Sequence, residues 1–345
     1  MNEFLLNEIS EQPSVIRNLI QDKKELVSEI CKSIEGRFDY IVIAARGTSD
    51  NAARYAKYLL GAMNQIQVAL ATPSLFTIYS SPPVFKRALV LGISQSGQSP
   101  DIVSVLKTAK EQGSPTLAIT NDVNSPIANV AEHVIPLDVG EEKAIAASKT
   151  YSSSLAALAL FSTQLSGKED SYEQLIALPD KLSETMKSAK NNIDQTSRYR
   201  YMEECVVLGR GFNYATAYEI SLKVKELTRV ITVPYSSADF KHGPIATVHR
   251  GFPIIVVAPS GKILSHIYDF SKNLIGLGAE LIVISDDQKI LDLGRSRFEI
   301  SSDVPEWLSP LNAVIPGQLF ARQLAIEKGY DSDNPEGLSK VTETF

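Results

Sequence analysis

The segment Ser94–Ser99 has the residue types that best suit anion binding. It holds three serines, two glutamines and one glycine. The apolar run 87–93 predicts a buried parallel strand before it, and helical spacing of apolar residues over 100–110 predicts a helix after it. Ser99 then takes the N-cap and Pro100 the first helical position. Hydroxyls and free N–H groups at a helix N-terminus bind anions, so we predict a phosphate site. Taken alone, such a loop is more often an ordinary connection.

The kind of anion follows from what the segment lacks. A P-loop needs a lysine after its last glycine, and here Gly97 is followed by Gln98. The sequence also has no G-x-G-x-x-G fingerprint. A phosphate on a small molecule therefore fits this loop better than a nucleotide.

Three ionisable residues lie close together in a helix predicted to start near Tyr214. Glu219, Lys223 and Glu226 are spaced so that they share one helix face. Carboxylates can move protons during catalysis. The spacing alone nevertheless favours a solvated, salt-bridged surface stripe.

Two more candidates lie in predicted loops. His242 belongs to the segment 239–244, where Gly243 and Pro244 break both helix and strand. Lys340 lies in a polar tail that contains Gly and Pro. The ordinary explanations are a turn histidine bonded to backbone and a solvated tail lysine.

Composition excludes several functional classes. The chain has 345 residues, a net charge of −6 and 44% hydrophobic residues, and this acidic balance argues against a nucleic-acid partner. No basic N-terminal region and no bilayer-length apolar run is present, so we expect no membrane association. Cys31 and Cys205 are isolated, and the four histidines show no ligand spacing. We therefore expect a cytoplasmic protein with no metal.

Strand and helix patterns alternate through the first half of the chain. Helices are predicted over 3–33 with a break at Pro13, and a long apolar helix over 147–165. The predicted strands are 38–45, 66–70, 87–93, 116–119 and 133–137. Such alternation is typical of a doubly wound parallel sheet.

The second half repeats this plan. A helix near 172–192 precedes predicted strands at 204–208, 252–258 and 281–287. Ala258–Gly261 corresponds to the start of the serine-rich loop but has fewer donors. The sequence therefore indicates a tandem duplication with one anion site per chain, in the first copy.

The ordered motifs resemble the isomerase half of the glutamine–fructose-6-phosphate aminotransferases (glucosamine-6-phosphate synthases), a family with tandem sugar-isomerase (SIS) domains. Each motif is weak alone, but their order is specific and covers essentially the whole chain. The matching segments are Glu8–Pro13, Gly47–Ser49, Ser94–Gly97, Ala146–Lys149, Gly209–Gly211, Glu219–Glu226, Lys241–Pro244, Leu308–Pro310 and the tail at Lys340. The resemblance implies an α/β fold of two SIS units, each a five-stranded parallel sheet with flanking helices in a flavodoxin-like three-layer sandwich.

The resemblance also implies substrate contacts. Most of them would be contacts to the sugar phosphate, and one would be a backbone contact to the sugar. The matching positions are Ser49, Ser94, Gln95, Ser96 and Ser99 for the sugar phosphate, and Ile145 for the backbone contact.

Catalytic roles follow from the same resemblance. Glu226 matches the base that moves a proton between C1 and C2. Lys223 matches a second active-site lysine, and Glu219 a supporting carboxylate. His242 matches the ring-opening residue, supplied in the family by the partner subunit, and Lys340 matches the lysine that forms a Schiff base with the ketose.

The chain departs from the family pattern in several places. Residue 2 is Asn where the family has the nucleophilic cysteine of a glutaminase domain, and about forty residues precede the first strand, so we expect no glutaminase domain. Gln98 replaces an acidic residue, Ser99 a threonine and Asp50 a tyrosine, while Asp239–Phe240 stands where Glu-Leu is usual. These changes surround the predicted site.

The function implied is that of an aminosugar-phosphate deaminase/isomerase, similar to SIS-type glucosamine-6-phosphate deaminases. Its best specific form converts glucosamine 6-phosphate to fructose 6-phosphate and ammonia. Galactosamine-6-phosphate deaminase, fructosamine-6-phosphate deglycase and ammonia-dependent glucosamine-6-phosphate synthase remain open. So does a non-catalytic sugar-phosphate sensor, although a sensor does not need Glu226, His242 and Lys340 together.

We expect four parts in the chain. These are N-terminal helices (1–33), a first SIS unit with the phosphate loop (34–170), a second with the catalytic helix and the Lys241–Pro244 loop (171–330), and a C-terminal lid or tail (331–345). The expected partners are a small-molecule sugar phosphate and a second copy, forming a homodimer with shared active sites. No cofactor, nucleic acid or membrane is expected.

Overall fold

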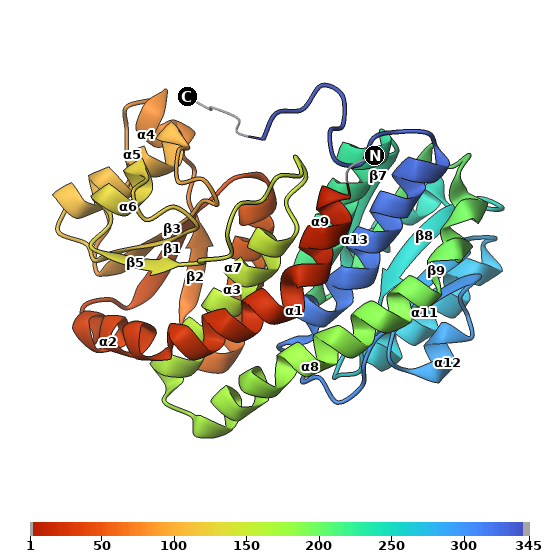
Figure 1. Cartoon of the computed structure of the whole chain (residues 1–345), viewed down its shortest axis with the longest axis horizontal. Coiled ribbons are helices and arrows are strands. Elements are labelled where there is room, and N and C mark those ends of the chain that lie inside the picture. Colours follow the sequence, from red (N-terminus) through yellow and green to blue (C-terminus); the bar gives the residue numbers. More distant parts are fainter. Residues whose placement is uncertain (1–2, 341–345) are drawn as a thin grey trace. The chain divides into compact units, whose positions relative to one another are not determined.

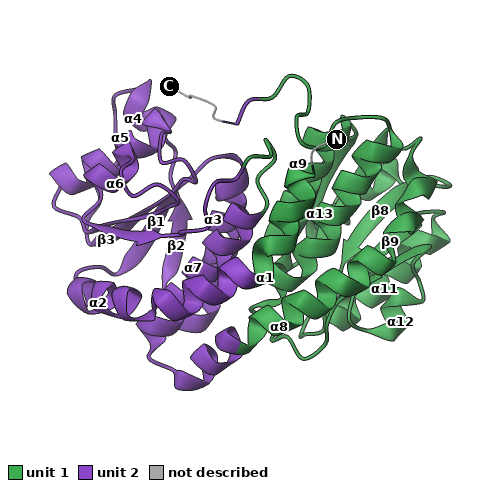
Figure 2. Cartoon of the chain, viewed as in Figure 1, with its two compact units in different colours: residues 1–13, 143–148, 177–338 green, residues 14–142, 149–176, 339–345 purple. Residues whose placement is uncertain are grey.

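The computed structural model describes residues 3–340, so residues 1–2 of the expected N-terminal part and 341–345 of the expected tail lie outside it. The chain divides into two compact units (Figure 2). Unit 1 comprises residues 1–13, 143–148 and 177–338, and unit 2 comprises residues 14–142, 149–176 and 339–345. Among the helices described, none combines the length and the apolar character that crossing a bilayer demands.

Unit 2 is built on a five-stranded parallel sheet, as predicted. Its strands lie in the order β2-β1-β3-β4-β5 (Figure 1). They are β1 (Tyr40–Ala44), β2 (Gln67–Leu70), β3 (Ala88–Ile93), β4 (Thr116–Thr120) and β5 (His133–Pro136). All six residues of β3 are buried, which explains its continuous apolar sequence, because an interior parallel strand is covered on both faces.

Helices cover both faces of this sheet. Side chains that alternate along the strands, among them Val42 and Val90, form one core with Ile102 of α5 and Ile127 of α6. Helices α3 and α7 pack on the other face and on each other. The helices up to residue 166 are α1 (Phe4–Asp22), α2 (Lys24–Ile34), α3 (Gly47–Asn64), α4 (Ser74–Thr77), α5 (Pro100–Glu111), α6 (Pro126–Val130) and α7 (Lys149–Ser166). The first part of α1, up to Pro13, belongs to unit 1. The three-layer sandwich is confirmed.

Unit 1 has the same architecture. Its sheet order, β10-β9-β8-β6-β7, is that of unit 2 written in reverse, so the predicted duplication is confirmed. The strands are β6 (Glu204–Gly209), β7 (Ile231–Ser236), β8 (Pro253–Val257), β9 (Glu280–Ser285) and β10 (Ser296–Glu299). The remaining helices are α8 (Glu169–Asn191), η1 (Ile193–Tyr199), α9 (Asn213–Thr228), α10 (Ser237–Phe240), η2 (Pro244–Thr247), α11 (Leu264–Gly276), α12 (Gln288–Leu291) and α13 (Ser309–Glu327).

The predicted break at Pro13 is wrong, because α1 continues through that residue. An interior proline costs a helix about 3 kcal/mol. Leu5 and Ile9 before it, and Ile16 and Ile20 after it, are all buried at helical spacing. Burial of this apolar stripe outweighs the local cost, since tertiary packing supplies most helix stability in proteins.

Each sheet has one point at which the helices that follow neighbouring strands lie on opposite faces of the sheet. In unit 2 the chain leaves β1 for α3 on one face and leaves the adjacent β3 for α5 on the other. In parallel α/β sheets ligands bind outside the carboxyl ends of the strands at this switch point. In unit 2 these ends lead into the residues that begin α3 and into the segment 94–99.

Candidate active site

The segment 94–99, called here the phosphate loop, is shaped around Gly97. This glycine has a φ of +65°, and a Cβ on it would lie 2.1 Å from Ser125 Oγ. The Gly97 carbonyl accepts a hydrogen bond from the Ile127 N–H at 3.2 Å. Only glycine suits both the left-handed backbone and this close approach, so the path of the loop depends on this residue.

The hydroxyls of the phosphate loop are arranged around that turn. Ser94 is buried, and its Oγ accepts the Gly97 N–H at 3.1 Å, while Ser96 Oγ accepts the Gln98 N–H at 3.3 Å. Ser99 is the N-cap residue of α5 as predicted, but its side chain makes no capping hydrogen bond. A hydroxyl that accepts a backbone N–H still has its own proton to donate. The loop can therefore present hydroxyl donors at the N-terminus of α5.

The second neighbouring helix, α3, places Ser49 in its first turn, half-buried. Arg46, the residue before this helix, donates from Nε to Asp101 Oδ2 at 2.7 Å. Asp101 is buried in the first turn of α5, so this ion pair joins the starts of the two helices at the switch point. The Arg46 side chain remains half exposed.

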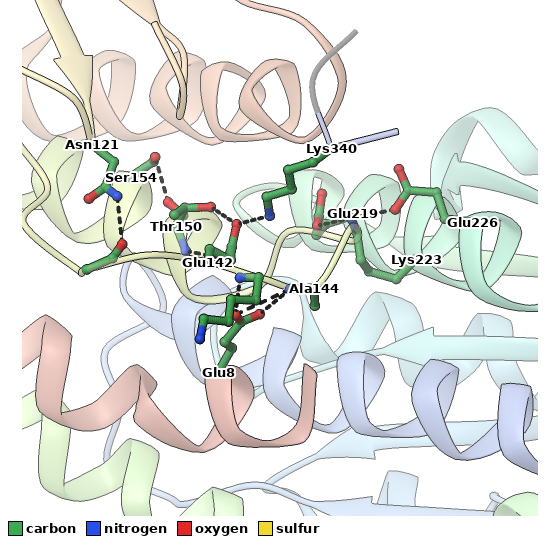
Figure 3. Close-up of polar contacts among 12 residues, drawn as sticks. Glu8, Asn121, Glu142, Ala144, Thr150, Ser154, Glu219, Lys223, Glu226 and Lys340 are labelled. Atoms are coloured by element: carbon green, nitrogen blue, oxygen red, sulfur yellow. Dashed lines mark hydrogen bonds and ion pairs between the residues drawn. The ribbon is translucent and has the colours of Figure 1, made fainter. Parts of the chain in front are cut away.

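In unit 1, α9 carries the predicted trio of ionisable residues. Lys223 Nζ lies 2.6 Å from Glu226 Oε2 and 3.6 Å from Glu219 Oε1 (Figure 3). Glu219 and Lys223 are almost completely buried, whereas the Glu226 side chain is 24% exposed. The surface-stripe interpretation is therefore wrong for two of the three residues. A buried ammonium between two carboxylates leaves Glu226 as the member of the trio that solvent reaches.

A pocket of about 230 Å³ opens beside Glu226 within unit 1. Leu227 and Arg229 line it from the end of α9, and Tyr330 and Asn334 line it from the segment after α13. Glu226 thus lines a pocket that a small polar molecule can enter.

His242 lies where the sequence predicts a loop, although α10 extends into the first part of that segment. Its backbone N–H donates to the Asp239 carbonyl at 3.0 Å, and its side chain is exposed. The ring is thus accessible on the surface of unit 1.

Lys340 does not lie free in solvent. Its Nζ is 2.9 Å from Glu142 Oε2, within unit 2 (Figure 3). The Glu142 side chain is fully buried, and its carboxylate also accepts the backbone N–H and the hydroxyl of Thr150. The solvated-tail interpretation of Lys340 is therefore wrong.

Ile145 lies in a short segment that buried acids hold in place within unit 1. Its N–H donates to the Asp333 carbonyl at 3.1 Å, and the Asp333 carboxylate accepts the Leu5 N–H at 2.9 Å. Glu8 accepts the N–H groups of Lys143 and Ala144 (Figure 3). Because its N–H is already engaged, a backbone contact from Ile145 to a sugar would have to come from its carbonyl.

Neither cysteine is activated as a nucleophile. Burial raises the pKa of the Cys31 and Cys205 thiols to about 12, so both remain protonated at neutral pH. Within the described part of the chain, no group of three or more His, Cys, Asp or Glu side chains could hold a metal ion.

The structure adds polar residues that the sequence did not single out. Arg46 and Asp101 pair at the switch point, and Glu142 and Thr150 hold the amine of Lys340. The only local sequence signal for these four residues was the acidic residue in the first turn of the helix predicted over 100–110. No sequence pattern links partners so far apart.

Comparisons with known proteins agree with this architecture. The SIS domain model matches residues 39–163 and 202–327. Glutamine–fructose-6-phosphate aminotransferase [isomerizing] from Clostridium tetani is 31% identical and that from Pyrococcus horikoshii 30%, over 98% of this chain. The chain spans 58% and 57% of those two relatives.

Two solved structures are similar over nearly the full chain. The C-terminal domain of glucosamine-fructose-6-phosphate aminotransferase from Francisella tularensis has a TM-score of 0.87 and 26% identity, covering 97% of this chain and 99% of that one. A putative phosphosugar isomerase from Silicibacter pomeroyi has a TM-score of 0.86 and 26% identity, covering 96% and 99%. The two matched regions each contain all five strands of one parallel sheet. The chain belongs to the SIS domain family, whose domain it carries twice.

Proposed function

We propose that this protein is a phosphosugar isomerase that interconverts fructose 6-phosphate and an amino sugar 6-phosphate. Its specific reaction in this proposal is the deamination of glucosamine 6-phosphate to fructose 6-phosphate and ammonia. The observation that carries the proposal is the pairing of Lys340 with the buried Glu142. An amine kept at a defined place is suited to form an imine with a ketose carbonyl.

The relatives support the substrate class. Their name joins amino transfer, isomerisation and fructose 6-phosphate, and they match 98% of this chain. The phosphate loop supplies donors for a phosphate, in agreement with such a substrate.

The phosphate loop and three of the candidate catalytic residues each have a role in the proposed reaction. The phosphate loop binds the 6-phosphate, and His242 of the partner subunit in a homodimer opens the sugar ring. Glu226 moves a proton from C2 to C1, which turns the amino aldose into a 2-imino ketose. Lys340 replaces ammonia at C2, and water then hydrolyses the Lys340 imine to release fructose 6-phosphate.

The experiment that tests this proposal is a coupled assay of ammonia release. Glucosamine 6-phosphate, galactosamine 6-phosphate and fructosamine 6-phosphate are each supplied in ammonia-free buffer, and fructose 6-phosphate with ammonium is supplied in a parallel reaction. We expect equal amounts of ammonia and fructose 6-phosphate from glucosamine 6-phosphate. Faster turnover of another amino sugar phosphate would show that this sugar, and not glucosamine 6-phosphate, is the specific substrate. Binding without turnover of any of them would contradict an enzyme and favour a sensor.

A further inference from the structure

The amine of Lys340 and the carboxylate of Glu142 come from distant parts of the sequence, 198 residues apart. The Glu142 side chain has no exposed surface, and that of Lys340 is 25% exposed. A carboxylate removed from water needs hydrogen bonds and a positive charge to offset the cost of burial. Lys340 supplies such a charge, so the ion pair holds Lys340 in place within unit 2.

Thr150 fixes the orientation of the carboxylate. Its backbone N–H donates to Glu142 Oε1 at 3.1 Å and its hydroxyl donates to Oε2 at 2.8 Å. Thr150 lies in the first turn of α7, where the helix dipole also favours a negative charge. Oε2, the oxygen that receives the hydroxyl, is also the oxygen that faces Lys340 Nζ (Figure 3).

We infer that Glu142 is the positioning residue for Lys340, a role that rests on the proposed function. In the imine-forming step with fructose 6-phosphate, Nζ first releases one proton to solvent, and a carbon–nitrogen bond then forms between Nζ and C2. The C2 carbonyl oxygen leaves as water, taking one more proton from Nζ and one from solvent. The ammonium and the ketose thus become a protonated imine and one water, with one positive charge on each side. Because Nζ is cationic before and after the step, Glu142 stabilises both states while keeping the nitrogen in one place.

The test compares the wild-type protein with Glu142→Gln, which keeps the side-chain shape and removes the charge. Reductive methylation with formaldehyde, followed by peptide mass spectrometry, should label Lys340 several times faster in the variant. Borohydride trapping with fructose 6-phosphate should form the Lys340 adduct more slowly, on the order of a hundredfold, because a small displacement of a reacting group has effects of that size. The thermal shift produced by fructose 6-phosphate should persist, since the phosphate loop is unchanged.

Matched variants separate positioning from folding. Glu141→Gln removes an exposed neighbouring carboxylate and should change neither rate. Glu142→Asp retains the charge and should recover part of the adduct rate. Where Glu142→Gln does not fold, Thr150→Val loosens the carboxylate and should shift both rates in the same directions, whereas Thr150→Ser should not.

The outcomes distinguish the inference from the function on which it rests. A wild-type adduct that forms equally fast in Glu142→Gln overturns the positioning role alone, as does unchanged labelling of Lys340. A wild-type protein that forms no adduct overturns the proposed covalent chemistry together with this inference.

Discussion

Glu306 Oε2 accepts a hydrogen bond from the backbone N–H of Lys262 at 3.0 Å, in the loop of unit 1 that corresponds to the phosphate loop of unit 2. A Cβ on Gly261 would lie 2.3 Å from the carboxyl carbon of Glu306, so the acid occupies space that only glycine leaves free. Asp286 Oδ1 accepts the N–H of the adjoining Ser260 at 2.6 Å. Carboxylates of the chain thus occupy N–H groups that an anion would need, and we expect one phosphate site per chain, in unit 2.

Glu306→Gln tests this difference between the two loops. Removal of a charged acceptor from one backbone N–H should lower the free energy of unfolding by about 1 kcal/mol, measured by urea denaturation. Isothermal titration should still give one fructose 6-phosphate per chain with unchanged affinity. Glu299→Gln, which alters an exposed carboxylate on β10, is the control. Two sugar phosphates per wild-type chain would contradict the expectation.

A sugar 6-phosphate should stabilise the fold, and the unphosphorylated sugar should not. A ligand that binds only the native state at a hundred times its Kd adds about 2.7 kcal/mol to the free energy of unfolding. Ser94→Ala with Ser96→Ala should weaken this effect, because each donor lost to a charged group costs roughly 1–3 kcal/mol. Thermal unfolding with glucosamine and with glucosamine 6-phosphate provides the measurement. Equal shifts from the two sugars would exclude a phosphate site at this loop.

Gly97→Ala should damage the phosphate loop more than an ordinary positive-φ substitution does. Gly113 is the matched control, because it has a φ of +79° and nothing within 4 Å of the added Cβ. Gly113→Ala should cost about 1 kcal/mol of stability. Gly97→Ala should cost roughly 1–3 kcal/mol more from overpacking against Ser125 and should lose the sugar-phosphate thermal shift. Equal unfolding curves and shifts for the two variants would show that the close approach at Gly97 is unimportant.

The sequence predicted the parts of this fold that depend on local patterns. The strand β3 and the helix α5 lie where the sequence predicts them. The helix also starts as predicted, with Ser99 as N-cap and Pro100 as first residue. Two edge strands were missed. β7 contains a proline and has only one buried residue of its six, and β10 has only four residues. Both lie at sheet edges, where the apolar signal is weak.

The site was predicted less completely, and for a physical reason. Glu219 and Lys223 look like a surface stripe in sequence, yet α13 packs on α9, so closely that a Cβ on Gly317 would lie 2.3 Å from Ile220. Burial of charged residues depends on tertiary packing of this kind, which their spacing does not reveal. The roles assigned to the individual residues came from the family resemblance and remain predictions.

His242 should act on substrate bound by another copy of the chain. Its exposed side chain on unit 1 is accessible to a partner subunit. Mixing the inactive His242→Ala and Glu226→Gln proteins should then restore part of the activity, because hybrid dimers contain one site with both groups intact. The assay is ammonia release after mixing, with subunit exchange verified by differently tagged chains. Exchange without recovered activity would place the histidine in the site of its own subunit.

Lys223→Met should strongly destabilise the protein, since Lys223 is almost fully buried beside Glu219, which has no exposed side-chain surface. Loss of one partner from a buried ion pair leaves a desolvated charge and costs roughly 3–5 kcal/mol, to be measured by urea denaturation. Lys225→Met, an exposed position of the same helix, should cost little. Adding Glu219→Gln to Lys223→Met should recover much of the loss, because the unpaired charge is then gone. If the double variant is no more stable than Lys223→Met, the loss comes from packing, and the ion pair does not account for the burial of these two residues.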